Sequence, residues 1–160
     1  MKITDLGLTK FVRQRNALAG HGVKFGIQGN AGKDPESGVD ILDYALFNEF
    51  GIDTTISKGP RKGQRMHIPS RPFMRDFFER NQTALATAMQ TAIHAVDAGM
   101  PTSQALDQLG LLCQGAQQRH VQNSKSWAVP NAPATIRRKK SDKPLFNHGF
   151  LVGAIRYVKV

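Results

Sequence analysis

The sequence predicts an α+β fold in which a small, mostly antiparallel sheet packs against a long amphipathic helix pair, with extended basic loops outside this core. Two stretches with apolar residues at helical spacing, separated by a Gly-Met-Pro break at residues 99–101, predict the helix pair. An alternating segment at residues 23–27 predicts a strand with one buried face. The length of 160 residues and the hydrophobic content of 40% predict a single folded domain over residues 1–160.

The N-terminal part predicts a short helix followed by a strand. The helix should end before Gly20, and its stripe at helical spacing consists of Leu8, Phe11, Val12, Arg15 and Leu18. Residues 29–38 favour turns throughout, and the apolar residues at 39–52 follow a mixed period. We interpret 23–27 and this later stretch as a hairpin-like pair of extended segments, in which residues 45–50 could be helical.

The middle of the chain predicts an arm and then the two long helices. Residues 53–66 are polar and basic and contain Gly and Pro, which indicates an exposed loop or arm. Ser70 is expected to cap the first long helix, with Pro72 in its first turn. The apolar stripe of that helix is Phe73, Phe77, Leu85, Met89, Ile93 and Val96. The second helix should begin near Thr102 or Ser103, and its stripe is Leu106, Leu109, Cys113, Ala116 and His120.

The last third of the chain predicts a long loop and a C-terminal strand. Residues 124–146 contain three prolines, a basic run and little periodicity, so they are expected to form an ordered or semi-ordered loop. The final residues begin as a helical turn and end in an alternating strand that should pair into the sheet, with Ile155 and Tyr157 on one face.

The net charge of +10 and the pI near 10.2 indicate contact with something acidic: nucleic acid, an anionic membrane or an acidic protein neighbour. Two polar runs supply most of the candidate contact residues for a neighbouring subunit or for DNA. They are Lys58, Arg61, Lys62 and Arg65 in the arm, and Arg137, Arg138, Lys139, Lys140 and Lys143 in the loop.

Motifs for catalysis, cofactors and metals fail at specific positions. A phosphate-binding loop ending at Gly32 and Lys33 would need glycine where Ile27 stands and a hydroxyl residue where Asp34 stands. The five histidines lack zinc-site spacing, and the single Cys113 lies in a helical apolar pattern. The sequence therefore predicts no enzyme, no cofactor and no metal site. A nuclease site remains the minor alternative, built from Asp40, Asp43, Glu49 and Asp53.

No secretory signal or membrane span is expected, because the first residues carry charge and no apolar run approaches the ~18 residues of a membrane-spanning helix. The protein is predicted to be soluble and cytoplasmic where it is made, without membrane contact.

Three segments have individual structural interpretations. In Asn-Glu-Phe-Gly at 48–51, Asn48 and Glu49 should satisfy backbone donors at a turn, Phe47 and Phe50 should enter the core, and Gly51 should supply a special backbone geometry. In Ser-Arg-Pro-Phe at 70–73, Pro72 presets the helix start and Phe73 anchors it. Arg71 is expected to pair with Glu49 or with a neighbouring subunit.

The third segment runs from Trp127 to the C-terminus. After the motif residue Pro144 it places Leu145 and Phe146 before the helix-cap candidate Asn147, and Gly149 should allow a close approach of the chain. With the first two motifs extended to residues 45–52 and 68–78, the three segments in this order resemble the tail-completion and head–tail joining (neck) proteins of tailed bacteriophages and prophages. His148 and Phe150 depart from the family pattern, which has a small hydroxyl residue and a more polar residue there.

The resemblance implies a structural virion protein rather than an enzyme. Members of this family assemble as a ring, usually of six copies, at the head-proximal end of the tail or in the neck, after synthesis in the host cytoplasm. The implied partners are copies of the chain itself, neighbouring tail-tube, tail-terminator, stopper or adaptor proteins, and DNA in the channel. The alternative is a nucleic-acid-binding protein that uses the two basic runs on phosphate.

Overall fold

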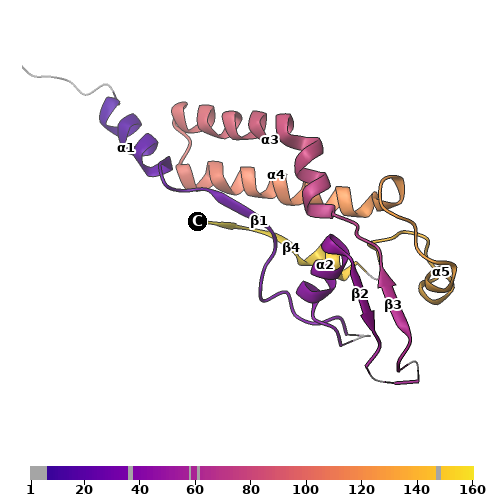
Figure 1. Cartoon of the computed structure of the whole chain (residues 1–160). Helices are drawn as coiled ribbons and strands as arrows, with labels where there is room; N and C mark the ends of the chain where they lie inside the picture. The colour runs from indigo at the N-terminus through magenta and orange to yellow at the C-terminus, as the bar shows by residue number, and fades with distance from the viewer. Residues whose placement is uncertain (1–6, 36–37, 58, 61, 147–148) are drawn as a thin grey trace, which may run out of the picture. The chain divides into compact units, whose positions relative to one another are not determined.

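The computed structural model describes residues 7–35, 38–57, 59–60, 62–146 and 149–160, without the side chain of Arg138. The chain divides into two compact units. The first contains the described part of Met1–Phe25 together with Asn81–Gly115 and Tyr157–Val160. The second contains the described parts of Gly26–Arg80 and Ala116–Arg156. The predicted α+β fold is confirmed: long helices α3 and α4 accompany two small antiparallel sheets (Figure 1).

The first unit is built on the predicted helix pair. Most of α3 (Phe73–Asp97) and α4 (Thr102–Gln122) lie side by side there and run in opposite directions (Figure 1). Between them Gly99 adopts a φ of 103°, the Met100 amide donates to the Ala95 carbonyl, and the Gly99 amide donates to the Val96 carbonyl. These two hydrogen bonds around a left-handed glycine form a Schellman motif, which ends α3. The predicted helix break at residues 99–101 is therefore confirmed.

Helix α1 (Leu8–Leu18) forms where the N-terminal periodicity predicts it, and Gln14 in its second half bonds to the turn between α3 and α4. Arg15 makes two hydrogen bonds to the Asp97 carboxylate, at 2.6 and 2.8 Å. This bidentate pair lowers the pKa of Asp97. The Thr102 hydroxyl donates to the Gln14 carbonyl at 3.2 Å. These polar contacts attach the C-terminal half of α1 to the helix pair.

One sheet joins the N-terminal strand to the C-terminus. β1 (Val23–Ile27) pairs with β4 (Ile155–Lys159), and just beyond them Gly22 and Val160 exchange two backbone hydrogen bonds, an antiparallel arrangement. Within the first unit, Tyr157 and Lys159 of β4 both bond to Asp107 of α4, which attaches the strand to the helix. The hairpin predicted between residues 23–27 and 39–52 is wrong, because β1 pairs with β4 instead.

The second unit gathers the short elements. They are α2 (Ile41–Phe50), β2 (Ile52–Thr55), β3 (Arg65–Ile68), the 3-10 turn η1 (Ser124–Ser126), α5 (Pro133–Lys139) and α6 (Phe150–Ala154). The Asp40 carboxylate accepts from the Leu42 amide at 2.9 Å and caps α2, which forms a helix over most of the stretch interpreted as extended. The hydrophobic core of the unit consists of Ile41, Ala45, Phe73, Val121, Leu145, Leu151, Val152, Ala154 and Ile155.

The predicted arm at 53–66 is part of a β-hairpin. β2 and β3 pair antiparallel from Ile52 opposite Ile68 to Thr55 opposite Arg65. Every described residue from 53 to 66 is exposed except the half-buried Ile56, which agrees with an exposed arm. Among the described residues, β2 and β3 have no third strand beside them.

The stretch predicted as a long loop, 124–146, contains η1 and α5 and is packed into the second unit. Ser124, Ala128, Asn131, Pro144 and Leu145 in it are buried. Prolines and cations suggested a loop, but residues 133–139 form the short helix α5. Pro133 is compatible with this helix because it lies in the first turn, where proline is tolerated. Across the described residues, none of the helices is both long and apolar enough to span a bilayer.

Candidate functional site

The three segments that carry the family resemblance meet at Arg71. Its side chain is only 6% exposed and bonds to oxygens from both of the other segments. Nε donates to the Val129 carbonyl at 2.7 Å and Nη2 to the Pro130 carbonyl at 3.3 Å. Nη1 reaches Asn48 Oδ1 and Nη2 reaches Asn131 Oδ1, both at 3.4 Å. We call these five residues the Arg71 cluster.

The Arg71 cluster is a buried charge held by neutral oxygens. Burial lowers the pKa of Arg71, and the nearby Tyr44 acts in the opposite direction. Asn131 is held in turn by a bond from its Nδ2 to the Lys143 carbonyl at 3.1 Å. The guanidinium thus joins the end of α2, the start of α3 and the segment after Trp127 into one connected polar network.

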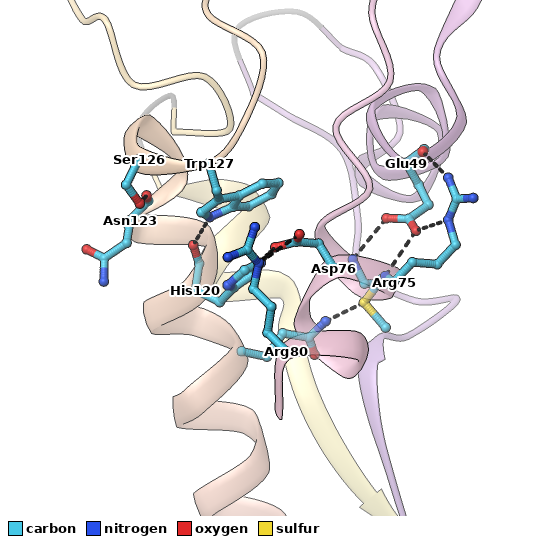
Figure 2. Close-up of polar contacts among 10 residues, drawn as sticks. Glu49, Arg75, Asp76, Arg80, His120, Asn123, Ser126 and Trp127 are labelled. Carbon is cyan, nitrogen blue, oxygen red and sulfur yellow. Dashed lines mark hydrogen bonds and ion pairs between the residues drawn. The ribbon is translucent and has the colours of Figure 1, made fainter. Parts of the chain in front are cut away.

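Glu49 caps the first turn of α3 (Figure 2). Its buried carboxylate accepts from the Met74 amide at 2.9 Å and from the Arg75 amide at 3.2 Å. Arg75 Nε adds a third bond to the same carboxylate at 3.1 Å. An acidic side chain at the positive end of a helix satisfies amides that have no partner inside the helix.

Two sequence predictions about this helix start are wrong. The Ser70 hydroxyl does not cap α3 but donates to the Glu49 carbonyl at 2.8 Å. Arg71 does not pair with Glu49, which takes Arg75 instead. Arg71 precedes the helix, whereas Arg75 is its third residue, and side chains of a helix lean back toward the N-terminus and reach a group placed there.

Gly51 ends α2 in a conformation that requires glycine. Its φ is 74°, and a Cβ there would lie 2.9 Å from the Ser70 amide nitrogen and 3.0 Å from the Ile68 carbonyl oxygen. The predicted special backbone geometry is confirmed. Phe47 is only half-buried and is not part of the hydrophobic core of the unit, and Phe50 is exposed and lies under the Arg75 guanidinium, so the predicted place of both side chains in the core is wrong.

A second polar group, which the sequence did not predict, surrounds His120 (Figure 2). The His120 ring stacks on Trp127 with centroids 4.4 Å apart, and the Trp127 indole donates to the His120 carbonyl at 3.0 Å. His120 Nε2 lies 3.0 Å from the Asp76 carboxylate, which also binds Arg80. The i,i+4 spacing of Asp76 and Arg80 was the only local signal in the sequence for this group.

This group predicts a pH-dependent contribution to stability. Burial lowers the pKa of His120, Asp76 raises it and Arg80 lowers it further. Because folding favours the neutral ring, the stabilisation is present above the ordinary pKa of about 6.5 and is lost as pH falls from there through the lower folded-state pKa. Chemical denaturation at several pH values should show a smaller loss of stability on acidification in His120→Gln than in the unsubstituted chain. His94→Gln, at an exposed position, is the control. Equal pH dependence in His120→Gln and the unsubstituted chain would refute the assignment.

The predicted contact cations divide into exposed and structural ones. Lys62 and Arg65 of the arm are exposed, as are Arg137, Lys140 and Lys143 in and after α5. Lys139 instead donates to the carbonyls of Lys143 and Pro144, both at 3.2 Å. Lys58, Arg61 and the side chain of Arg138 lie outside the described residues. Arg71 is buried in its own chain, so its guanidinium serves the fold.

Several residues of the third segment, from Trp127 to the C-terminus, are also packed into the second unit. Trp127 is half-buried, Pro144 and Leu145 are buried, and the Leu145 amide approaches the buried Ser124 hydroxyl at 3.4 Å. Gly149 precedes α6 with a φ of 78°. The cap candidate Asn147 and the departing residue His148 lie outside the described residues.

No protein-family model, curated protein or solved structure matches this chain. The sequence resemblance and the contacts of its residues are therefore the grounds for a functional proposal.

Three of the four acidic residues considered for a nuclease make structural contacts. Asp40 caps α2, Glu49 caps α3, and Asp53 pairs with His67 across the β2–β3 hairpin at 2.8 Å. Within the described ranges, no three His, Cys, Asp or Glu side chains are grouped as a metal site requires. Burial raises the pKa of the Cys113 thiol, which makes it a poor nucleophile.

Proposed function

We propose that this chain is a structural virion protein of a tailed phage or prophage, and that it acts without catalysis. Copies of it form a ring, of six subunits by analogy with the family it resembles, at the head-proximal end of the tail or in the neck. The ring completes the tail and joins it to the head. Its partners are adjacent tail-tube, terminator, stopper or adaptor proteins, with DNA passing through the channel.

The observation that supports this proposal most is the Arg71 cluster. Three segments that resemble the family in sequence, and that lie far apart along the chain, contact one another through Arg71. A chance resemblance in three separate segments would not require them to meet in space. Their meeting supports the interpretation that the segments form a fold signature.

The exposed β2–β3 hairpin and the exposed cations around α5 are available to neighbours. Ring assembly needs surfaces that meet a different surface on the next copy, and both parts project polar, basic side chains. Such charges steer association and fix the register of contacts with acidic neighbours.

The proposal predicts a loss of infectivity when the protein is absent. Phage made without this chain should lose infectious titre by orders of magnitude, and supplying the chain in trans should restore it. Arg137→Gln combined with Lys140→Gln should complement poorly, whereas Arg119→Gln, at another exposed cation, should complement fully. Substitution is preferable to deleting residues 137–143, because Lys139, Lys143 and the Lys125–Asp142 ion pair contribute structural bonds there. Normal titre without the chain would contradict the proposal.

The exposed cations also support a second candidate, a nucleic-acid-binding protein. If Lys62, Arg65, Arg137 and Lys140 each contacted a phosphate, the logarithm of affinity for mixed-sequence DNA would fall with the logarithm of salt concentration with a slope of about −3 to −4. Tight binding with this slope, together with weaker binding and about half the slope in the Arg137→Gln/Lys140→Gln variant, would favour this candidate over the ring.

A further inference from the structure

A half-open cleft of about 540 Å³ lies within the second unit, beside the end of β1 and the start of α2. Its described walls come from the turn after β1, the first residue of α2, helix α6 and the start of β4. The volume is within the range of about 300–1,000 Å³ that is typical of ligand sites. None of the described lining residues belongs to the Arg71 cluster or to the group around His120, so the contacts of those two groups do not account for the cleft.

The buried part of the cleft lining is apolar. Ile41 and Ala154 belong to the hydrophobic core of the unit, and the half-buried Ala31 packs against that core. Gly153 of α6 is exposed at the cleft, and a Cβ placed on it would meet no other atom within 4 Å. The absence of a side chain at this position keeps the cleft open, so an apolar side chain that enters it leaves water and contacts the core.

The polar part of the lining has free bonding groups. Arg156 is exposed, and its guanidinium forms no hydrogen bond or ion pair within the part of the chain that the structure describes. The same holds for the side chain of Asn30 among those residues. Gln28 Nε2 donates to the Arg156 carbonyl at 3.4 Å, which holds the Gln28 side chain beside Arg156. The cleft therefore offers one cation together with amide groups that both donate and accept.

These groups match a short stretch of peptide. Peptide bonds need both a donor and an acceptor, which the side-chain amides of Gln28 and Asn30 supply. The apolar part of the lining suits an aliphatic side chain, and one guanidinium matches one carboxylate. A nucleic-acid backbone needs a series of cations, whereas Arg156 is the only cation among the described lining residues. The net charge of +10 also favours an acidic neighbour.

We propose that this cleft binds an acidic peptide segment of another protein, in which an aliphatic residue stands next to an aspartate or a glutamate. The aliphatic side chain occupies the apolar part of the cleft beside Gly153, and the carboxylate pairs with Arg156. A single copy of the chain carries the whole cleft, so the inference does not rest on the proposed ring. It adds to the exposed cations a site that selects a neighbour by shape as well as by charge.

A titration of the full-length chain, followed by two-dimensional 1H–15N NMR, tests the cleft. The probe is acetyl-Leu-Asp-Leu-amide, whose only charge is one carboxylate. The amide signals of Ala31, Ile41 and Gly153 should shift and saturate with a Kd on the order of 1 mM, as expected for so short a ligand. The same tripeptide with asparagine in place of aspartate should bind about fivefold more weakly, because it lacks the ion pair. No saturable shift of these signals, or equal binding of the two tripeptides, would overturn the inference.

Two substitutions with matched controls assign the contacts. Gly153→Leu fills the cleft and should weaken binding at least about tenfold, while α6 should still form because leucine favours a helix more than glycine does. Ala134→Leu makes a similar addition at an exposed position of α5 and should leave binding unchanged. Arg156→Gln should remove the preference for aspartate over asparagine, whereas Arg119→Gln, at another exposed cation, should keep it. Equal effects of a substitution and its control would contradict the proposed contacts.

Inorganic phosphate distinguishes a peptide site from a general anion site. At the same concentration as the tripeptide, it should leave the signals of Ala31, Ile41 and Gly153 nearly unchanged, because it has no side chain for the apolar part of the cleft. Shifts as large as those from the tripeptide would show that Arg156 binds anions of any kind, and the inference would fail.

Discussion

Arg71→Ala is expected to lower the free energy of unfolding by about 3–5 kcal/mol. The substitution removes the donors to the buried Asn48 and Asn131 side-chain oxygens and to two partly buried carbonyl oxygens, and it leaves all four acceptors without this partner. An unsatisfied buried polar group costs about 1–3 kcal/mol, so several together produce a large loss. Urea denaturation of the purified chain measures it.

Arg137→Ala is the matched control, because it removes the same side chain from an exposed position of α5 and should change stability by no more than about 0.5 kcal/mol. Arg71→Lys should recover only part of the loss, because an ammonium cannot reproduce the planar fork of a guanidinium. A loss below about 1 kcal/mol for Arg71→Ala would show that the cluster does not hold the three segments together.

Glu49→Ala is expected to cost about 2–3 kcal/mol, through the loss of the α3 cap. The Met74 and Arg75 amides would lose their acceptor, and the positive end of the helix would lose a buried carboxylate. Glu49→Gln retains one oxygen acceptor and should cost less than Glu49→Ala. The same denaturation experiment measures both variants.

Glu79→Ala serves as the control for charge, since Glu79 is an exposed residue of the same helix. It should leave stability nearly unchanged. Equal losses in Glu49→Ala and Glu79→Ala would mean that the carboxylate of Glu49 acts only through net charge and that the cap contributes nothing.

Elements with a clear period were predictable from the sequence. The stripe of Leu8, Phe11 and Val12 predicts α1, alternation predicts β1 and β4, and the break at 99–101 separates α3 from α4. Local periodicity reports which face of an element is apolar. It does not report what covers that face, so the exposure of the α1 stripe appears only in the structure.

The errors arise where distant residues decide the structure. The stretch at 39–52 has no consistent period, and Asp40 fixes its start as a helix through a cap. The hydrogen-bond partners of Glu49 and Arg71 were also not predictable from the sequence. Glu49 lies more than twenty residues before the amides it caps, and Arg71 takes its acceptors from residues about sixty positions later. The sequence could mark these residues as structurally important, but it could not pair them.

The central claim is that this protein joins heads to tails, and electron microscopy of lysates made without it tests this claim most directly. Negative-stain images should show complete heads and assembled tails lying separately, and the chain supplied in trans should restore joined particles. Fully joined particles in the absence of the chain would contradict the account.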